Sequence, residues 1–332
     1  MSISSFIAAL PKTDLHVHLV GSASASTVLE LARRRPDAGV PTDPAALAQF
    51  YTFTDFAHFV EVYYTVDRLV REPEDVTALV VGAARDAAVS NVRWMELTVT
   101  ATTHLRAGID GSALRDALEL GAEIASRDHG VQLGWIIDIP GEFGLDAADA
   151  TVAFLQDHAP MGTVAIGLAG IERDVPRAQF AWHVDQARDL GYRAVIHAGE
   201  SSGPESVWSA LDDLHADRIG HGIRAVDDQA LLTRLARTGV PLEVCVTSNL
   251  RTNVVGELAT HPVGILLAEG IRVVVATDDP GMFDTDLNTE YEHVAAVTGY
   301  GETELAELAR AGVRASFAPD SVKERILADI DG

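Results

Sequence analysis

Short runs of apolar and β-branched residues recur along the chain and alternate with longer stretches of helical periodicity. Each run is almost continuously apolar at its start, which is typical of parallel strands covered on both faces. The eight runs occupy residues 13–19, 92–99, 132–139, 163–170, 192–200, 218–222, 241–249 and 272–280. Two of the intervening stretches, 112–128 and 227–238, carry a clear apolar stripe and open with residue types that cap helices well.

This alternation predicts an α/β protein in which parallel strands are joined by right-handed helical crossovers. Eight such units suggest a closed (β/α)8 barrel of the TIM type, formed as a single domain over residues 1–332. An open, doubly wound sheet is the alternative, but no G-x-G-x-x-G motif follows the first predicted strand to support it.

Two segments interrupt the regular alternation. Residues 20–91 are predicted to form a helical insertion after the first strand, and residues 286–329 are predicted to form additional C-terminal helices. Within the insertion, the aromatic-rich stretch 53–70 is expected to be a helix that covers the barrel mouth. Its aromatic residues include Phe53, Phe56, Phe59 and Tyr63. In this interpretation, Phe53, Phe56 and Phe59 line the substrate site. In the alternative interpretation, Phe56, Phe59 and Tyr63 simply pack on the barrel.

The composition excludes several classes of function. The chain has 25 basic and 49 acidic residues, a formal charge of −24, so we expect no nucleic-acid partner. The one basic cluster, Arg33 to Arg35, suits the C-terminal end of a helix. Lys12 and Lys323 are the only lysines. Residues 13–322 therefore contain no lysine that could form a Schiff base or complete a phosphate-binding P-loop.

The cysteine and hydropathy patterns indicate the compartment. Cys245 is the only cysteine, which excludes an intrachain disulfide and a thiolate metal cluster and fits a reducing compartment. The N-terminal segment shows no secretory signal, and no apolar run approaches the ~20 residues needed to cross a bilayer. We therefore expect a soluble, cytoplasmic protein without a membrane partner, whose oligomeric state the sequence does not indicate.

Polar side chains gather where the predicted strands end, which is where barrels of this type carry their functional residues. They are His16, His18, His197, Glu200, His221, Asp278 and Asp279. Three imidazoles and one carboxylate suit a borderline cation such as Zn²⁺, which lowers the pKa of bound water towards ~7. Glu200 is placed to donate and accept protons, and His221 could take a proton from the attacking water or hold the hydroxide. The pattern predicts metal-assisted hydrolysis.

The ordered motifs resemble those of the adenosine deaminase family of zinc-dependent aminohydrolases. They are LPKTDLHVHLVGS (10–22), HAGE (197–200), HG (221–222), TSN (247–249) and TDDP (277–280). The resemblance implies one zinc ion per chain, with His16, His18, His197 and Asp278 as its ligands. Relatives with two metal ions bridge them with a carboxylated lysine, and no lysine here can reach a strand end.

The resemblance also implies the roles of the remaining site residues. Glu200 would protonate purine N1 while hydroxide attacks C6, with His221 as base or electrostatic partner of that hydroxide. Asp279 would meet purine N7, and the backbone of Gly170 would donate to N3. The expected products are a 6-oxopurine and ammonia, and the expected partner is a small purine nucleoside.

Two positions depart from the family pattern. Val20 stands where relatives usually carry an acidic residue that meets the ribose 5′-hydroxyl, and leaving that hydroxyl unpaired would cost about 1–3 kcal/mol. The stretch HLVGSAS resembles a branch of the family in the futalosine route to menaquinone, which deaminates 6-amino-6-deoxyfutalosine. Val20 and the aromatic cover would suit the 5′-carboxybenzoyl ring of that nucleoside. Gly167 stands where relatives with an IDLAG sequence carry aspartate.

The favoured substrate is therefore 6-amino-6-deoxyfutalosine, with adenosine or 2′-deoxyadenosine as the close alternative. Adenine is third, because adenine deaminases usually keep a glutamate at position 20. A non-catalytic zinc- or nucleoside-binding barrel and a zinc hydrolase of esters or amides are the alternatives from other classes.

Three further sets of residues carry weaker interpretations. Ser248 and Asn249 either orient Asp278 or the substrate from outside the ligand set, or form a polar cap on the seventh strand. Cys245 is interpreted as a packing residue. The remaining histidines, His261 among them, have no strand-end context and are expected at the solvent-exposed surface.

Overall fold

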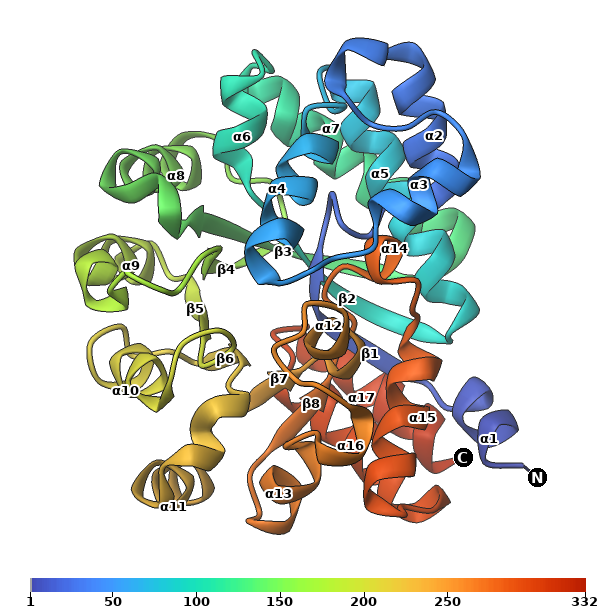
Figure 1. Ribbon diagram of the computed structural model, residues 1–332, viewed down its shortest axis with the longest axis vertical. Helices are drawn as coiled ribbons and strands as arrows, with labels where there is room; N and C mark the ends of the chain where they lie inside the picture. Colours follow the sequence, from blue (N-terminus) through green and yellow to red (C-terminus); the bar gives the residue numbers. More distant parts are fainter. Residues whose placement is uncertain (1) are drawn as a thin grey trace.

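The computed structural model describes residues 2–332, whose strands form one parallel sheet at the centre of a ring of helices (Figure 1). The strands follow one another around the sheet in chain order, as the predicted barrel requires. They are β1 (Lys12–His18), β2 (Val92–Val99), β3 (Gln132–Pro140), β4 (Thr163–Ala169), β5 (Arg193–Ala198), β6 (Arg218–His221), β7 (Leu242–Val244) and β8 (Val273–Val275).

The seam between the last strand and the first closes just beyond β8. The backbone N–H of His18 donates to the carbonyl of Asp278 at 2.9 Å, and the N–H of Asp278 donates to the carbonyl of His16 at 2.8 Å. Val17 and Asp278 thereby form a parallel bridge. The (β/α)8 prediction is confirmed, and the alternative of an open sheet is wrong.

Helices pack around the outside of the barrel and cross its mouth. Their bounds are α1 (Ile3–Ala9), α2 (Ala25–Arg34), α3 (Pro44–Phe50), α4 (Phe56–Asp67), α5 (Pro73–Val89), α6 (Ala101–Arg106), α7 (Gly111–Ile124), α8 (Gly144–His158), α9 (Ala181–Asp189), α10 (Pro204–Asp212), α11 (Gln229–Thr238), α12 (Val246–Arg251), α13 (Val263–Ala268), α14 (Pro280–Phe283), α15 (Leu287–Thr298), α16 (Glu302–Ala315) and α17 (Asp320–Asp331). Within residues 2–332, no helix combines the length and the apolar character that a bilayer span would need.

Local capping explains why several of these helices start and end where they do. The side chain of Asp228 accepts hydrogen bonds from the N–H groups of Ala230 and Leu231 and so begins α11. That helix ends at Gly239, whose φ of +70° only glycine adopts without strain. The predicted stretch 227–238 therefore contains one capped helix, Gln229–Thr238.

The long excursion after β1 contains α2 to α5, as its helical prediction requires. The basic triplet ends α2, where Arg34 and Arg35 both pair with the buried carboxylate of Asp75 on α5. At the other end of the chain, α15, α16 and α17 follow the barrel, and α16 packs against β1 and β8. The first contact joins α2 to α5 within the insertion, and α5 in turn packs against β2, so the insertion and the C-terminal helices both rest on the barrel.

The predicted seventh strand is too long. β7 ends at Val244, and Cys245 to Asn249 turn into α12, where the N–H of Asn249 donates to the carbonyl of Cys245 at 3.1 Å. The β-branched sequence of this stretch favours a strand, but the buried carboxylate of Glu290 on α15 accepts the N–H of Thr247 at 3.1 Å. A tertiary contact thus overrides local propensity, and Ser248 and Asn249 lie on a helix rather than capping a strand.

Candidate active site

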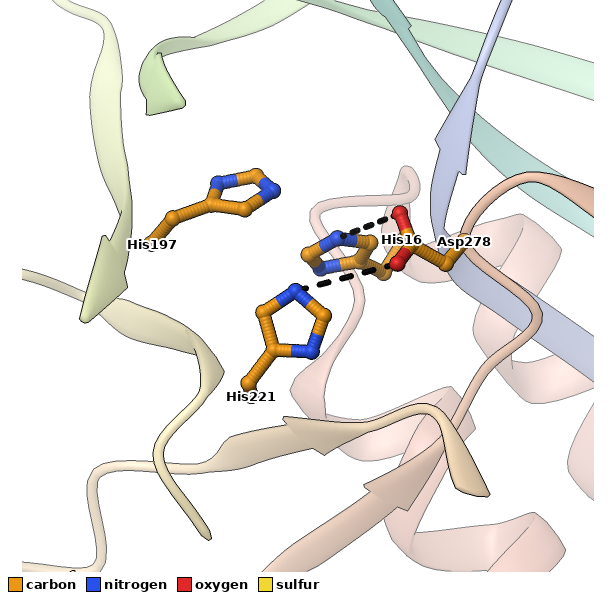
Figure 2. Close-up of side chains that lie close together, drawn as sticks. All are labelled: His16, His197, His221 and Asp278. Atoms are coloured by element: carbon orange, nitrogen blue, oxygen red, sulfur yellow. Dashed lines mark ion pairs between the residues drawn. The ribbon is translucent and has the colours of Figure 1, made fainter. Parts of the chain in front are cut away.

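The carboxyl ends of four strands bring their histidines and an aspartate into one cluster (Figure 2). One potential ligand atom from each of His16, His197, His221 and Asp278 lies within 4.8 Å of the others. His18 joins the cluster from the same side, because its Nε2 lies 3.1 Å from Nε2 of His197 and 3.4 Å from Oδ1 of Asp278. The structure therefore gathers the residues that the strand-end pattern selected.

Two of these residues occupy a backbone region that L-amino acids rarely adopt. His221 has φ of +61° and Asp278 has φ of +66°. Such strain costs about 1–3 kcal/mol per residue and persists where surrounding structure enforces it. For Asp278, the enforcing contacts are the two backbone hydrogen bonds that close the barrel seam.

A buried ionic network supports His16 from below. Oε2 of Glu243 on β7 lies 2.8 Å from Nδ1 of His16, and its Oε1 accepts from Nε of Arg218 at 2.5 Å. Arg218 also donates to Glu96 on β2, and all three side chains of this Glu–Arg–Glu network are at most 1% exposed. The carboxylate of Glu243 fixes the proton of His16 on Nδ1 and leaves Nε2 directed at the cluster.

The protonation states suit metal binding. Burial lowers the pKa of His18 to about 4 and holds the pKa of His197 well below its usual range, so both imidazoles are neutral. Burial also acts to lower the pKa of His16, but contacts with Asp278 and Glu243 outweigh it and raise the pKa to about 10. A metal ion at Nε2 of His16 would therefore displace a proton.

The residues fit a divalent metal ion on the evidence of their unpaired atoms. Nε2 of His16 is buried without a hydrogen-bond partner, although it lies 3.4 Å from Oδ1 of Asp278. Nε2 atoms of two neutral imidazoles, His18 and His197, face each other at 3.1 Å. A cation among these nitrogens and the Asp278 carboxylate would satisfy all of them, and such a mixed N/O set suits Zn²⁺.

Glu200 is held at the cluster by a second carboxylate. Glu172 accepts the backbone N–H groups of Gly199, Glu200 and Ser201 at 2.8–2.9 Å and thereby shapes the turn that follows β5. Burial, together with the nearby charges of Asp278 and Glu172, holds the pKa of Glu200 well above its usual range. Glu200 is therefore a buried proton donor, and its Oε2 lies 3.6 Å from Nε2 of His221.

A chain of hydrogen bonds fixes the tautomer of His221. The backbone N–H of Val263 donates to Nδ1 of His261 at 3.1 Å, so the proton of His261 lies on Nε2 and is donated to Oδ1 of Asn249 at 3.1 Å. The amide nitrogen of Asn249 then donates to Nδ1 of His221 at 3.4 Å. Neutral His221 consequently carries its proton on Nε2, the atom that faces Glu200 and Asp278.

Ser248 and His261 show what the sequence left open or missed. Ser248 donates to Oδ2 of Asp278 at 2.7 Å, and so it contacts the aspartate that it was expected to orient. His261 is 3% exposed, so the expectation of a solvent-exposed side chain is wrong. It had no strand-end context because it lies in the loop before α13 and reaches the site through Asn249.

The cluster forms the floor of a cleft that is partly open to solvent and holds about 520 Å³ of free space, the open part included. Its lining includes His18, His197, Glu200, His221, Asp278, Asp279, Gly170, Asp138, Glu142, Phe56, Phe59, Val60, Tyr63 and Tyr64. Of these, Asp279 has a pKa held well above its usual range, by burial and by the neighbouring charge of Asp278. No arginine or lysine of residues 2–332 lines this cleft.

Only part of the aromatic stretch lines the cleft. Phe56 and Phe59 on α4 line the cleft, whereas Phe53 and Val20 are buried but do not line it. Phe53 instead packs on Phe59 and Phe283, with ring centroids 5.3 and 5.8 Å away. Phe53 precedes α4, so the helix that carries Phe56 and Phe59 over the mouth does not include it.

The structure explains the glycine at position 167. Gly167 on β4 lies beside Asp138 on β3, and a Cβ atom at 167 would lie 2.8 Å from Cβ of Asp138. Burial raises the pKa of Asp138 to about 7.

Replacing Gly167 with alanine is expected to lower the free energy of unfolding by about 1–3 kcal/mol, because the methyl group overpacks the barrel against Asp138. Urea denaturation measures the effect. Gly82→Ala on α5 is the control: its nearest neighbouring atom would be 3.9 Å away, so we expect a gain of about 0.5–1 kcal/mol. Equal stability of Gly167→Ala and the unchanged protein would contradict this explanation.

The fold and the site together define a metal-dependent hydrolase of the (β/α)8 class, with its metal cluster at the carboxyl ends of the strands. The sequence pattern described as adenosine deaminase matches residues 11–332. The chain belongs to the adenosine deaminase family, and it is a deaminase.

Individual proteins refine this assignment. The chain is 50% identical to the aminodeoxyfutalosine deaminase of Streptomyces avermitilis, over 99% of this chain and 92% of that one. Its structure resembles adenine deaminase from Arthrobacter aurescens with a TM-score of 0.91 and 30% identity, over 97% of this chain and 98% of that one. It also resembles an amidohydrolase from Burkholderia ambifaria with bound Zn, with a TM-score of 0.89 and 27% identity. That match covers 99% of this chain and 92% of the amidohydrolase.

Proposed function

We propose that this deaminase converts 6-amino-6-deoxyfutalosine to the 6-oxopurine and ammonia. The observation that carries the proposal is the pair of buried carboxyl groups, Glu200 and Asp279, that line the cleft beside the metal cluster. Burial and neighbouring negative charge raise the pKa of both groups, which favours their proton-donating form. A 6-aminopurine presents acceptor nitrogens, N1 and N7, on either side of its amino-bearing C6. Two buried proton donors flanking a hydrolytic centre therefore match that ring edge.

The proposed ligands of a single zinc ion are His16, His18, His197 and Asp278. When bound, the ion would supply an activated water for attack on C6. We leave His221 out of the ligand set. The hydrogen bonds from His261 through Asn249 place the proton of His221 on Nε2, so this imidazole directs a proton and not a lone pair towards the cluster. A neighbouring structure with bound Zn and the absence of a lysine at the carboxyl end of any strand support one zinc ion per chain.

The chain's own residues move and hold the protons. Glu200 donates its proton to N1, which makes C6 more electrophilic. Its carboxylate then takes up the proton that the attacking water releases and passes it to the amino group, which leaves as ammonia. Glu200 regains a proton from the new C6 hydroxyl as the carbonyl forms, and N1 keeps its proton in the product. Asp279 donates to N7, and the N–H of Gly170 donates to N3. His221 donates a hydrogen bond from Nε2–H to the incoming oxygen and holds it in position. Because Nε2 already carries a proton, it cannot act as the base that deprotonates the water.

The 5′ side of the nucleoside decides between the candidate substrates. The wall of the cleft under α4 is apolar, formed by Phe56, Phe59 and Val60, and Val20 supplies no carboxylate for a 5′-hydroxyl. Phe56, Phe59 and Val60 suit an aromatic 5′-substituent such as the carboxybenzoyl group. The identity of 50% to the Streptomyces avermitilis enzyme, against 30% to the adenine deaminase structure, supports the same choice.

A comparison of three substrates on one zinc-loaded preparation tests the proposal. We expect kcat/KM for 6-amino-6-deoxyfutalosine to exceed that for adenosine by about 10-fold or more, since an unpaired 5′-hydroxyl costs about 1–3 kcal/mol. Adenine should be the poorest of the three. Ammonia release gives a common readout, and a tenfold preference for adenosine would show that the Val20 argument is wrong.

A further inference from the structure

One carboxylate in the wall of the cleft is only half satisfied. Glu142 follows β3 in a short turn, where its Oε1 accepts a hydrogen bond from the hydroxyl of Tyr64 on α4 at 2.7 Å. Its Oε2 is buried and has no partner among the described residues. A buried acceptor without a donor is unfavourable, so this oxygen is directed at space that a ligand group would fill.

The backbone of Gly170 locates that oxygen within the cleft. Gly170 has φ of +79°, and a Cβ atom there would lie 1.8 Å from Oε2 of Glu142. The carboxylate therefore rests directly on the peptide of Gly170, and only glycine leaves room for it. Tyr64 holds the other oxygen, so the position of Oε2 is set from two elements.

The chemistry of a nucleoside tells which of its groups comes closest. In the anti conformation, C4 and N3 of the purine lie on the C2′ side of the sugar, and C8 lies on the side of the ring oxygen. With N3 facing Gly170, the 2′-hydroxyl is the nearest sugar donor to Glu142. The 5′-substituent points the other way, towards Asp279 and the apolar wall under α4.

We propose that Glu142 accepts a hydrogen bond from the ribose 2′-hydroxyl and thereby selects ribonucleosides over 2′-deoxyribonucleosides and over the free base. This inference rests on the proposed function, which places purine N3 at Gly170. Asp138 is the rival acceptor, since it lines the same cleft and its Oδ1 is also buried without a partner. It is the weaker candidate, because no contact places its free oxygen at Gly170.

The test compares adenosine with 2′-deoxyadenosine on the zinc-loaded full chain. We expect the unchanged protein to prefer adenosine in kcat/KM by about 10–100-fold, the usual effect of one hydrogen bond to a charged group. Glu142→Met removes both acceptor oxygens, so it should lower the value for adenosine by that factor and leave 2′-deoxyadenosine within about 3-fold. Glu142→Gln keeps one acceptor oxygen and should restore part of the preference.

The ratio between the two substrates separates this role from a general loss of folding, which lowers both values together. Asp146→Asn, an exposed carboxylate four residues further on in α8, is the matched control and should leave the ratio unchanged. Equal turnover of the two substrates by the unchanged protein would overturn the inference. So would a preference that survives Glu142→Met, or one that is lost in Asp138→Asn instead.

Two more measurements keep the failures distinct. 3′-Deoxyadenosine should react like adenosine, and a loss confined to it would assign Glu142 to the 3′-hydroxyl and overturn the 2′ assignment. Turnover of 6-amino-6-deoxyfutalosine is measured on the same preparation. If nucleosides are deaminated without 2′ discrimination, only this inference fails, whereas absence of any nucleoside turnover overturns the proposed function and this inference with it.

Discussion

Glu200→Gln is expected to lower kcat/KM by about 10²–10⁴-fold, the contribution of a positioned general acid. Burial, Asp278 and Glu172 raise the pKa of Glu200, which favours the protonated side chain that can donate to N1. Glutamine keeps the volume and a hydrogen-bond donor but cannot release a proton. Ammonia release from 6-amino-6-deoxyfutalosine measures the loss.

The same variant should bind zinc as the unchanged protein does, because Glu200 is outside the proposed ligand set. Zinc content after dialysis checks this point. Glu205→Gln, an exposed carboxylate in the first turn of α10, is the control and should retain full activity. Turnover of Glu200→Gln at the native rate would exclude Glu200 as the general acid.

Arg218→Met is expected to lower the free energy of unfolding by about 3–5 kcal/mol, the cost of leaving buried charges without their partner. Arg218 is the countercharge of both Glu96 and Glu243, and its guanidinium also lies 3.9 Å from the ring centroid of Phe317. Without it, Glu96 remains inside the barrel with no cation beside it, and Glu243 keeps only His16 as a partner. Urea denaturation of the metal-free protein measures the change.

The effect should extend to the metal centre. Burial acts to raise the pKa of Glu243, but Arg218 and His16 outweigh it and hold the pKa below its usual range. When Arg218 is removed, burial favours the protonated form, which no longer accepts from Nδ1 of His16. We expect zinc affinity to fall by about 10–100-fold, the usual result of losing a residue that orients a ligand.

Arg193→Met provides the control for this prediction. Arg193 pairs with Asp217 at 3.3 Å, but its side chain is 61% exposed, and surface pairs of this kind contribute about 0–1 kcal/mol. It should change neither stability nor zinc affinity appreciably. A similarly small change in Arg218→Met would mean that the Glu–Arg–Glu network does not support His16.

The Glu–Arg–Glu network that supports His16 could be only partly predicted from the sequence. Glu96 and Glu243 are single carboxylates inside otherwise apolar strands, and burying such a group is costly unless it is paired. That pattern signals a buried partner, but it does not say which arginine provides it. Arg218 lies 122 residues from Glu96 in the chain, and only closure of the barrel brings them together.

The sequence by itself determined the barrel and the residues that carry the chemistry. Periodicity defines strands and helices locally, and strand ends in a parallel barrel share one face, so His16, His18, His197, His221 and Asp278 could be placed together before any coordinates. The low lysine content could also be read directly from the sequence, and it excludes Schiff-base chemistry and a lysine-bridged pair of metal ions. These inferences needed only local pattern and the topology that it implies.

The tertiary structure decided how those residues act. The tautomer of His221 depends on Asn249 and on the backbone of Val263, the glycine at 167 depends on Asp138, and the free oxygen of Glu142 depends on Tyr64. The contacts of His221 with Asn249, of Gly167 with Asp138 and of Glu142 with Tyr64 each join two different elements of the fold. Hydrogen-bond direction and burial arise from such contacts, so they set the pKa values and unpaired atoms that no linear pattern encodes.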